Sequence, residues 1–568
     1  MNKIGKYFLG IQPFKILIFI ILILAFLLRF WNVWNQDLFG DEAPDAFRAI
    51  GYIDYLGTSF QTQPIDWYKN TALPWWTSLS FHDFPPLAMI IQHAFFAVFG
   101  DSLLVARLPA IILGVISVFL LYLIAKKFFE NEILALFSAL FFAINSEMVW
   151  IFRTSMLEPI LLFFILLNIY FFYQFIYENK SGHYWWLFGI SLGLVTLTKY
   201  TGVFLLPVYI LYILITKREI FKNWRLYAAF LLAILLFLPV IIYNIYLYKA
   251  TGHFDLQISY FLGQETPEWT GLVGKIQSPF SDILKNLMFQ QKDSAPNSVW
   301  PVGYYGLPAI LAVLGGIVYS LQDFLKKKFK GFVFFSLYFI FVTLLLFKIG
   351  SAHRFLALYG PAFAIFAGYL VNSLWNLKIK KGVGLAFKAL IFIFFIWELS
   401  HSINTNFIQY PNYGMANLDN FFRNEFRGRE SAVVPESDNP HLNDVIGEFV
   451  DKKSANAPRA LWLVIYNDNV ALPTLEWIYY KMFFYHSIPA MYVENFNKAV
   501  SIQGSDYFKG FDIYFVQSTE NTPLNQFKKE KTAGLEFENR LQKMGLQPMK
   551  IIHGQNNLPM FRIYKFSL

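Results

Sequence analysis

The run FKILIFIILILAFLLRFWNVW at residues 14–34 decides the fold class of this chain. It has about the length of 20 apolar residues that an α-helix needs to cross a bilayer. Lys3 and Lys6 precede it, and no small-residue cleavage site follows it. The run therefore predicts an uncleaved signal-anchor helix whose N-terminus lies in the cytoplasm.

Ten further apolar runs follow the first one and predict a polytopic all-α membrane protein with about eleven transmembrane helices. A further run, residues 87–99, is too short to span and follows Pro85 and Pro86, so we expect an interfacial helix there. The ten expected spans are residues 107–125, 132–149, 156–176, 184–199, 201–216, 226–247, 303–321, 331–348, 355–375 and 384–402.

The composition supports the same class. Hydrophobic residues make up 56% of the 568 residues and charged residues only 15%, where soluble proteins have roughly 25% charged residues. The chain has no cysteine, which excludes disulfide scaffolds, iron–sulfur clusters and cysteine nucleophiles. The net charge of +9 comes from short basic loops between apolar runs rather than from a basic stripe, so we expect no nucleic-acid partner.

The basic loops also predict the topology. With 87–99 counted as interfacial, Lys126, Lys127 and Lys180 fall on the side of the N-terminus, as the positive-inside rule requires. The chain then lies in the plasma (inner) membrane with its C-terminus outside. Residues 1–402 form the membrane module, with outer loops at 35–106 and 248–301, and residues 403–568 form a soluble extracytoplasmic domain.

The C-terminal part has the composition of a soluble protein. Strand-like apolar runs at 461–466 and 511–516 flank a helical pattern at 473–484. This order predicts a small α/β domain.

Adjacent acids follow the first span in the sequence Phe39-Gly40-Asp41-Glu42-Ala43. A carboxylate that is partly desolvated at a membrane surface has a raised pKa and can take a proton from a hydroxyl acceptor. The pair also fits the acidic first turn of an interfacial helix, which the helix dipole stabilises. Both interpretations stay open on the pair alone.

The first outer loop holds a second group of candidates. His82 and Asp83 precede Pro85-Pro86, which favours a fixed, extended turn at the headgroup level. Trp75 and Trp76 offer a platform for a sugar ring, although tryptophans at this depth more often anchor a protein at the interface. We treat all four as candidate acceptor- or sugar-binding residues.

Cations at the outer ends of later spans complete the set. Arg153 precedes Glu158 by five residues, Lys199 ends another span, and His353-Arg354 begins a third. Each fits snorkelling or an ordinary ion pair when taken alone. Together with Asp41 and Glu42 they share one membrane face, where cations suit an anionic lipid-phosphate donor and an acid suits its nucleophile.

At these residues the sequence resembles the GT-C superfamily of polyprenyl-phosphate-sugar glycosyltransferases, in particular the branch of protein O-mannosyltransferases and lipid A aminoarabinose transferases (ArnT-like). The similarity covers roughly residues 14–375. Its elements, in order, are Asp41-Glu42, Pro85-Pro86-Leu87, Phe99-Gly100-Asp101-Ser102, Arg107-Leu108-Pro109, Arg153 with Glu158, and Gly193-Leu194 through Lys199-Tyr200.

The resemblance implies roles for these residues. Asp41 would be the base or orient the acceptor, Arg153, Lys199 and Arg354 would hold the lipid phosphate, and transfer would invert the anomeric carbon. Phe84 stands where relatives usually have His or Lys, and Glu158 stands where many have Asp. The absence of a β-trefoil repeat in the sequence indicates a prokaryotic enzyme.

The sequence therefore predicts an inverting glycosyltransferase that moves a sugar from a polyprenyl-phosphate carrier to a lipid, protein or cell-envelope glycan outside the membrane. Asp41, Glu42 and Glu158 are the catalytic candidates, and Arg153, Lys199, His353 and Arg354 the phosphate-binding ones. A divalent cation, Mg²⁺ or Mn²⁺, is a candidate cofactor, with Asp41 and Glu158 as its ligands. A multi-span transporter or flippase of lipid-linked sugars is the main alternative, and an exported binding domain on a membrane anchor is a third.

Overall fold

The computed structural model describes residues 13–57, 62–178, 182–264, 279–290, 303–325, 330–377, 380–467, 470–523 and 533–568. The chain divides into two compact units. Unit 1 contains residues 1–33, 76–91 and 107–410, and unit 2 contains residues 34–75, 92–106 and 411–568. We describe each unit separately. The basic residues Lys3, Lys6 and Lys180 lie outside the described residues.

Unit 1 is helical, and every apolar run expected to span the membrane contains a helix. Its elements are α2 (Pro13–Phe30), α7 (Glu132–Ile144), α8 (Ser146–Ile151), α9 (Glu158–Tyr177), α10 (Tyr184–Thr198), η3 (Tyr200–Phe204), α11 (Leu205–Thr216), η4 (Arg218–Lys222), α12 (Trp224–Thr251), α13 (Leu256–Leu262), α14 (Phe280–Met288), α15 (Leu307–Leu325), α16 (Lys330–Ile349), α17 (His353–Leu356), η5 (Ala357–Tyr359), α18 (Gly360–Trp375), α19 (Lys381–Ile403) and η6 (Asn404–Ile408). Four elements have residues in both units: η1 (Val33–Asn35), η2 (Trp75–Ser78), α5 (Leu87–Phe99) and α6 (Leu103–Phe129).

Seven helices in the described part of the chain are long and apolar enough to cross a membrane. They are Phe14–Asn35, Leu103–Phe129, Glu158–Tyr177, Trp224–Thr251, Lys330–Ile349, His353–Trp375 and Gly382–Ile408. The other four expected spans are apolar helices of 10–17 residues, and so is Leu87–Phe99. The prediction of a multi-pass helical membrane protein is confirmed, with seven candidate spans; a total of eleven stays a prediction.

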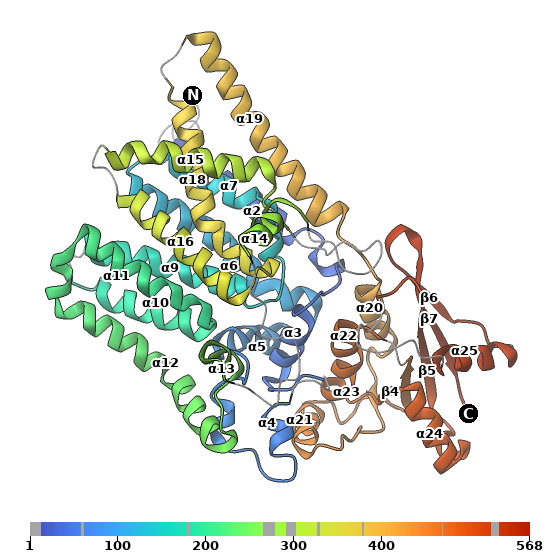
Figure 1. Cartoon of the computed structure of the whole chain (residues 1–568). Coiled ribbons are helices and arrows are strands. Elements are labelled where there is room, and N and C mark those ends of the chain that lie inside the picture. The colour runs from blue at the N-terminus through green and yellow to red at the C-terminus, as the bar shows by residue number, and fades with distance from the viewer. Residues whose placement is uncertain are drawn as a thin grey trace, which may run out of the picture. The chain divides into compact units, whose positions relative to one another are not determined.

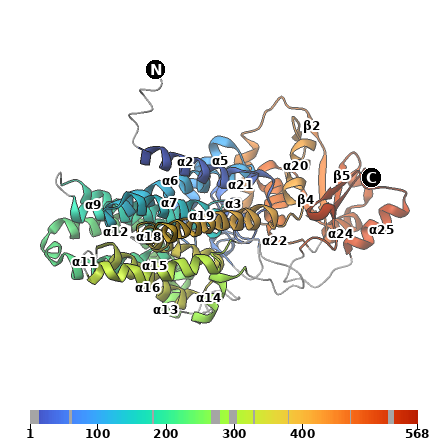
Figure 2. The same cartoon turned by 90° about the horizontal axis from the view of Figure 1, so that it is seen from above.

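Close packing between helices begins at small residues. Helix α10 packs against both α9 and α12 (Figure 1). A Cβ at Gly189 would lie 2.6 Å from the carbonyl oxygen of Ala229, and one at Gly193 would lie 2.9 Å from Cβ of Leu236. This Gly-x-x-x-Gly spacing brings two backbones together without help from the hydrophobic effect, which is absent inside a membrane. In the same unit, α15 packs along α18 (Figure 2).

Unit 2 has a five-stranded sheet in the order β4-β3-β5-β7-β6. Strand β3 is parallel to β4 and β5, and β7 is antiparallel to β5 and β6. The strands are β1 (Glu430–Ser431), β2 (Arg459–Ala460), β3 (Trp462–Tyr466), β4 (Ala490–Tyr492), β5 (Asp512–Ser518), β6 (Lys550–His553) and β7 (Pro559–Phe566), and β1 pairs only with β2. The two predicted strands and the α/β composition are confirmed.

Helices cover both faces of this sheet. Phe496 of α24 and Phe537 of α25 pack with Ile465 and Phe515 on one face. The helical elements of unit 2 are α3 (Glu42–Gly51), α4 (Pro64–Trp67), η2 (Trp75–Ser78, which begins in this unit), α20 (Met415–Glu425), α21 (Pro440–Val450), α22 (Leu472–Thr474), η7 (Leu475–Tyr480), α23 (Lys481–His486), α24 (Val493–Gln503), η8 (Ser505–Phe508), α25 (Ala533–Lys543) and η9 (Gln555–Asn557).

The other face carries aromatic contacts. Phe426 follows α20 and packs on Trp462 with 4.5 Å between ring centroids, and Tyr479 stacks on Tyr466 at 3.9 Å. The helical segment expected at 473–484 is present as α22, η7 and α23, of which η7 is a π-helix.

Glu476 lies in this π-helix and is fully buried. Burial, which Arg48 only partly offsets, raises its pKa to about 8. The folded protein therefore keeps a proton that the unfolded chain releases above about pH 4.5, so the free energy of unfolding falls as the pH rises from about 4.5 to about 8. We expect Glu476→Gln to remove most of this slope in thermal unfolding. Glu448→Gln, an exposed site, should leave it unchanged, and equal slopes in both variants would contradict the assignment.

Candidate active site

The centre of the site in unit 1 is a carboxylate held by two cations. Glu158 is the first residue of α9, where the helix dipole favours a negative charge. Its Oε1 accepts a hydrogen bond of 2.5 Å from Nζ of Lys199 and lies 3.6 Å from Nε of Arg354. The side chains of Lys199 and Glu158 are 7% and 3% exposed, whereas that of Arg354 is 32% exposed. Arg354 is therefore the most exposed member of this cluster.

Local structure explains why these three residues meet. Lys199 lies at the break between α10 and η3, and Arg354 lies in the short helix α17. The ring of Phe355 lies 4.9 Å from Nζ of Lys199 and 4.9 Å from Cζ of Arg354, so one aromatic ring orients both cations. The cluster carries one net positive charge and can receive an anion at its exposed side.

Tyr200 extends the site toward the segment that follows α12. Its hydroxyl donates to Asp255, which also accepts 2.8 Å from Nδ2 of Asn244. Asp255 is the N-cap residue of α13, and its side chain accepts from the backbone N–H of Ile258. Burial raises the pKa of Asp255, against the effect of these hydrogen bonds.

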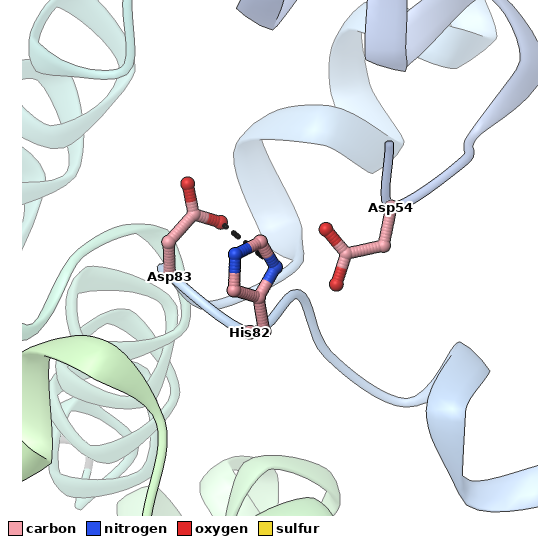
Figure 3. A group of neighbouring side chains, drawn as sticks. All are labelled: Asp54, His82 and Asp83. Atoms are coloured by element: carbon pink, nitrogen blue, oxygen red, sulfur yellow. Dashed lines mark ion pairs between the residues drawn. The ribbon is translucent and has the colours of Figure 1, made fainter. Parts of the chain in front are cut away.

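The turn at His82 and Asp83 holds this loop in place. The backbone N–H of Leu256 donates 2.9 Å to the carbonyl of His82, and the side chain of Gln257 donates 2.6 Å to the carbonyl of Asp83. Nδ1 of His82 lies 3.9 Å from Oδ1 of Asp83 (Figure 3). The structure thus brings His82 and Asp83 next to the segment that begins at Asp255. Asp255 in turn is hydrogen-bonded to Tyr200, the neighbour of Lys199.

Arg153 has contacts of a different kind. It is 3% exposed and donates 2.8 Å to the carbonyl of Leu28, and its guanidinium lies 4.4 Å from the ring centroid of Phe407. Arg29 donates to the carbonyl of Ala143 at 2.9 Å. Arg153 thus donates to a terminal carbonyl of α2 and Arg29 to one of α7, where helix-end carbonyls need donors. A phosphate-binding role for Arg153 stays a prediction.

The remaining candidates in unit 1 are buried. His353 is 4% exposed and precedes Arg354 in α17. Trp76 is 5% exposed and packs edge-on against Tyr243 at 5.3 Å. Trp76 therefore contributes to the packing of α12, and a sugar platform at this residue stays a prediction.

Asp41, Glu42 and Trp75 belong to unit 2. Glu42 begins α3, is 1% exposed and accepts 3.4 Å from the backbone N–H of Phe39. Asp41 precedes it, is partly buried and makes no side-chain hydrogen bond that caps α3. Trp75 is 63% exposed. Convergence of Asp41 with the cations of unit 1 stays a prediction.

A divalent cation fits Glu158 poorly, because that carboxylate is already neutralised by two cations. His82 and Asp83 offer the ligand types that such an ion uses. A metal at Asp41 stays a prediction, and no step proposed below passes through a metal.

Three residues of the site were not assigned from the sequence. Tyr200 belongs to one of the sequence motifs but has no predicted role, and no role is predicted for Asn244 or Asp255. Asn244 is a polar residue within the apolar helix α12, a signal that could have found it.

Comparisons with known proteins extend this description. Residues 83–243 match the family model described as "Dolichyl-phosphate-mannose-protein mannosyltransferase". A protein of Aquifex aeolicus (strain VF5), described as an uncharacterized protein, is 29% identical over 154 residues, which cover 27% of this chain and 31% of that protein. The chain thus matches about a third of the length of this relative.

Two solved structures share the fold. ArnT from Cupriavidus metallidurans bound to undecaprenyl phosphate gives a TM-score of 0.52 at 11% identity over 97% of each chain. The archaeal oligosaccharyltransferase AglB from Archaeoglobus fulgidus, in complex with an inhibitory peptide and a dolichol-phosphate, gives 0.52 at 14% identity over 91% of this chain and 70% of that one.

The chain therefore shares the fold of these two solved structures. Residues 83–243, which include Glu158 and Lys199, match the glycosyltransferase family named above. The resemblance in the sequence and the enzyme class, a glycosyltransferase, are confirmed.

Proposed function

We propose that this protein is an inverting glycosyltransferase that moves a sugar from a polyprenyl-phosphate carrier to an acceptor hydroxyl. The Glu158–Lys199–Arg354 cluster carries the proposal. Glu158 and Lys199 lie in residues 83–243, which match the glycosyltransferase family, and Arg354 of α17 adds a second cation to them. The ArnT structure with the same fold holds undecaprenyl phosphate, a donor carrier of the type proposed here.

Lys199 and Arg354 would bind the phosphate of the donor and stabilise the charge that it gains as it leaves. Arg354 is the more exposed of the two, so it meets the donor first, while Lys199 lies deeper against Glu158. Fixed cations in a site of low water content stabilise developing charge far more than they would in bulk water. Glu158 would act as a positioning residue that aims both cations.

Asp41 would supply the base. Its carboxylate takes the proton of the acceptor hydroxyl, the acceptor oxygen forms a bond to the anomeric carbon, and the bond from that carbon to the phosphate oxygen breaks. The electron pair leaves with the polyprenyl phosphate, and the sugar is transferred with inversion. Glu42 would support Asp41 by fixing the turn at Phe39.

The reaction would take place on the periplasmic or extracellular side of the plasma membrane. Lys126 and Lys127 end α6, and Lys217 and Arg218 follow α11. The positive-inside rule assigns such basic ends to the cytoplasm. Glu158 and Lys199 lie at the opposite ends of their helices from the basic loops, which supports an outer site.

The proposal is tested with a radiolabelled polyprenyl-phosphate sugar and membranes that contain the protein. Covalent transfer to an acceptor is expected. Movement of the lipid-linked sugar across purified liposomes without transfer would contradict the proposal and favour the transporter alternative.

Arg354→Gln tests the phosphate site. Loss of a charge-assisted hydrogen bond should raise KM for the donor by about 10- to 100-fold, with a smaller effect on kcat. Arg225→Gln, in the first turn of α12, is the matched control and should leave both constants unchanged. An unaltered KM in Arg354→Gln would remove Arg354 from donor binding.

A further inference from the structure

The C-terminal domain contains a cavity that the transfer reaction does not use. The cavity has a volume of about 510 Å³ and lies among α20, the turn that follows it, β1 and α23. Five cationic side chains line it, against two acids, Asp419 and Glu430. The cations are Arg423, Arg427, Arg429, Lys453 and Lys481. A cavity of this size and sign is typical of a site for a small anion.

The deep cations of the cavity are already paired. Lys481 is 2% exposed and donates 2.6 Å to Asp419, which also accepts 3.1 Å from Nε of Arg423. Arg423 contacts Oδ1 of Asp101 at 3.0 Å, and His486 contacts its Oδ2 at 2.6 Å. Although burial raises the pKa of Asp101, its interactions with His486, Lys481 and Arg423 hold that pKa well below its usual range. This inner network is structural.

The charge that remains is concentrated on one turn. Arg427 and Arg429 flank Gly428, whose φ of +78° lets the chain reverse between α20 and β1. Within the described part of the chain, neither arginine has an acidic partner. Arg429 lies 5.3 Å from the ring centroid of Trp462, which holds its guanidinium at the cavity wall. The two side chains thus present two donor groups of the type that binds phosphate bidentately.

The other polar groups of the cavity suit hydroxyls instead. Asn424 and Glu430 also line the cavity, and Glu430 lies 3.5 Å from Lys453. A carboxylate repels a phosphate but accepts hydrogen bonds from hydroxyl groups, and an amide both donates and accepts. The two arginines suit a phosphate group, and Glu430 and Asn424 suit hydroxyl groups. The cavity therefore matches a ligand that carries both kinds of group.

We propose that this cavity binds a phosphorylated saccharide, with Arg427 and Arg429 on the phosphate and Asn424 and Glu430 on the sugar hydroxyls. The site is separate from the proposed donor site and does not depend on the transfer reaction. It gives the C-terminal domain a ligand-binding function of its own.

The test is calorimetric titration of the full-length purified protein with glucose 6-phosphate, inorganic phosphate and glucose. Glucose 6-phosphate should bind more tightly than either other probe and more weakly at high salt. The double variant Arg427→Gln/Arg429→Gln should weaken binding at least tenfold. Both residues are exposed, so folding should be retained. Arg540→Gln, on the exposed side of α25, is the matched control.

Absence of binding, or equal affinity in the double variant, would overturn the proposal. Equal affinity for inorganic phosphate would overturn its saccharide part. Binding to phosphatidylglycerol vesicles, lost in the double variant and without binding of glucose 6-phosphate, would assign the cavity to a lipid surface instead.

Discussion

Asp41→Asn is expected to lower kcat for sugar transfer by about 10²- to 10⁴-fold, the usual contribution of a general base. The substitution keeps the size and polarity of the side chain but removes its ability to take a proton. Asp41 makes no side-chain hydrogen bond that caps α3, so the helix should form normally in the variant. The measurement is transfer from a radiolabelled lipid-phosphate sugar, corrected for the amount of folded protein.

The neighbouring acid has different surroundings. Glu42 is 1% exposed and accepts a hydrogen bond from the backbone of Phe39, whereas Asp41 is only partly buried. We therefore expect Glu42→Gln to affect stability more and the pH profile of kcat less than Asp41→Asn does. Asp66→Asn, an exposed acid of the same loop, is the control. Undiminished transfer by Asp41→Asn would remove Asp41 from the mechanism.

Much of the membrane module could be predicted because its signal is local. A helix in a bilayer must be apolar along its whole length, so each run shows its position without knowledge of its neighbours. The lengths of the helices were harder to predict. Helix α7 ends before Asn145, and α10 ends before Lys199, where a 3₁₀ helix follows, although the apolar sequence continues past both ends.

The site was predictable only in part, for a related reason. Glu158, Lys199 and Arg354 could be found because charges near a membrane are rare and costly. Their partners depend on contacts between distant segments, such as Tyr200 with Asp255, which no local pattern encodes. Arg153 shows the converse, since its residue type suited a phosphate while its observed hydrogen bond is to the carbonyl of Leu28.

The C-terminal domain shows the same limit. Short apolar runs predicted β3 and β5, but β7 pairs with β5 across a long insertion. The contacts of Asp37 with the backbone of Tyr413 and Ala416, at 2.6 and 2.9 Å, join part of the predicted loop 35–106 to this domain. Composition places that loop with the membrane module, because it says nothing about such long-range hydrogen bonds.

Lys199→Met is expected to lower kcat/KM for the donor by about 10²- to 10³-fold, as loss of a preorganised charge at a leaving group usually does. It also leaves the buried Glu158 with Arg354 at 3.6 Å as its partner in the cluster. Lys222→Met, an exposed lysine of η4, is the matched control and should retain full activity. Lys199→Arg should recover part of the loss, because it restores the charge.

A double variant separates the two roles of Lys199. Glu158→Gln/Lys199→Met removes both charges of the buried pair and leaves the one net positive charge of Arg354. If Lys199 served only to neutralise Glu158, the double variant would regain both folding and transfer. If Lys199 binds the departing phosphate, as we propose, the double variant should regain thermal stability while transfer stays at the level of Lys199→Met. Recovery of transfer would assign donor binding to Arg354 alone and leave Lys199 as its structural support.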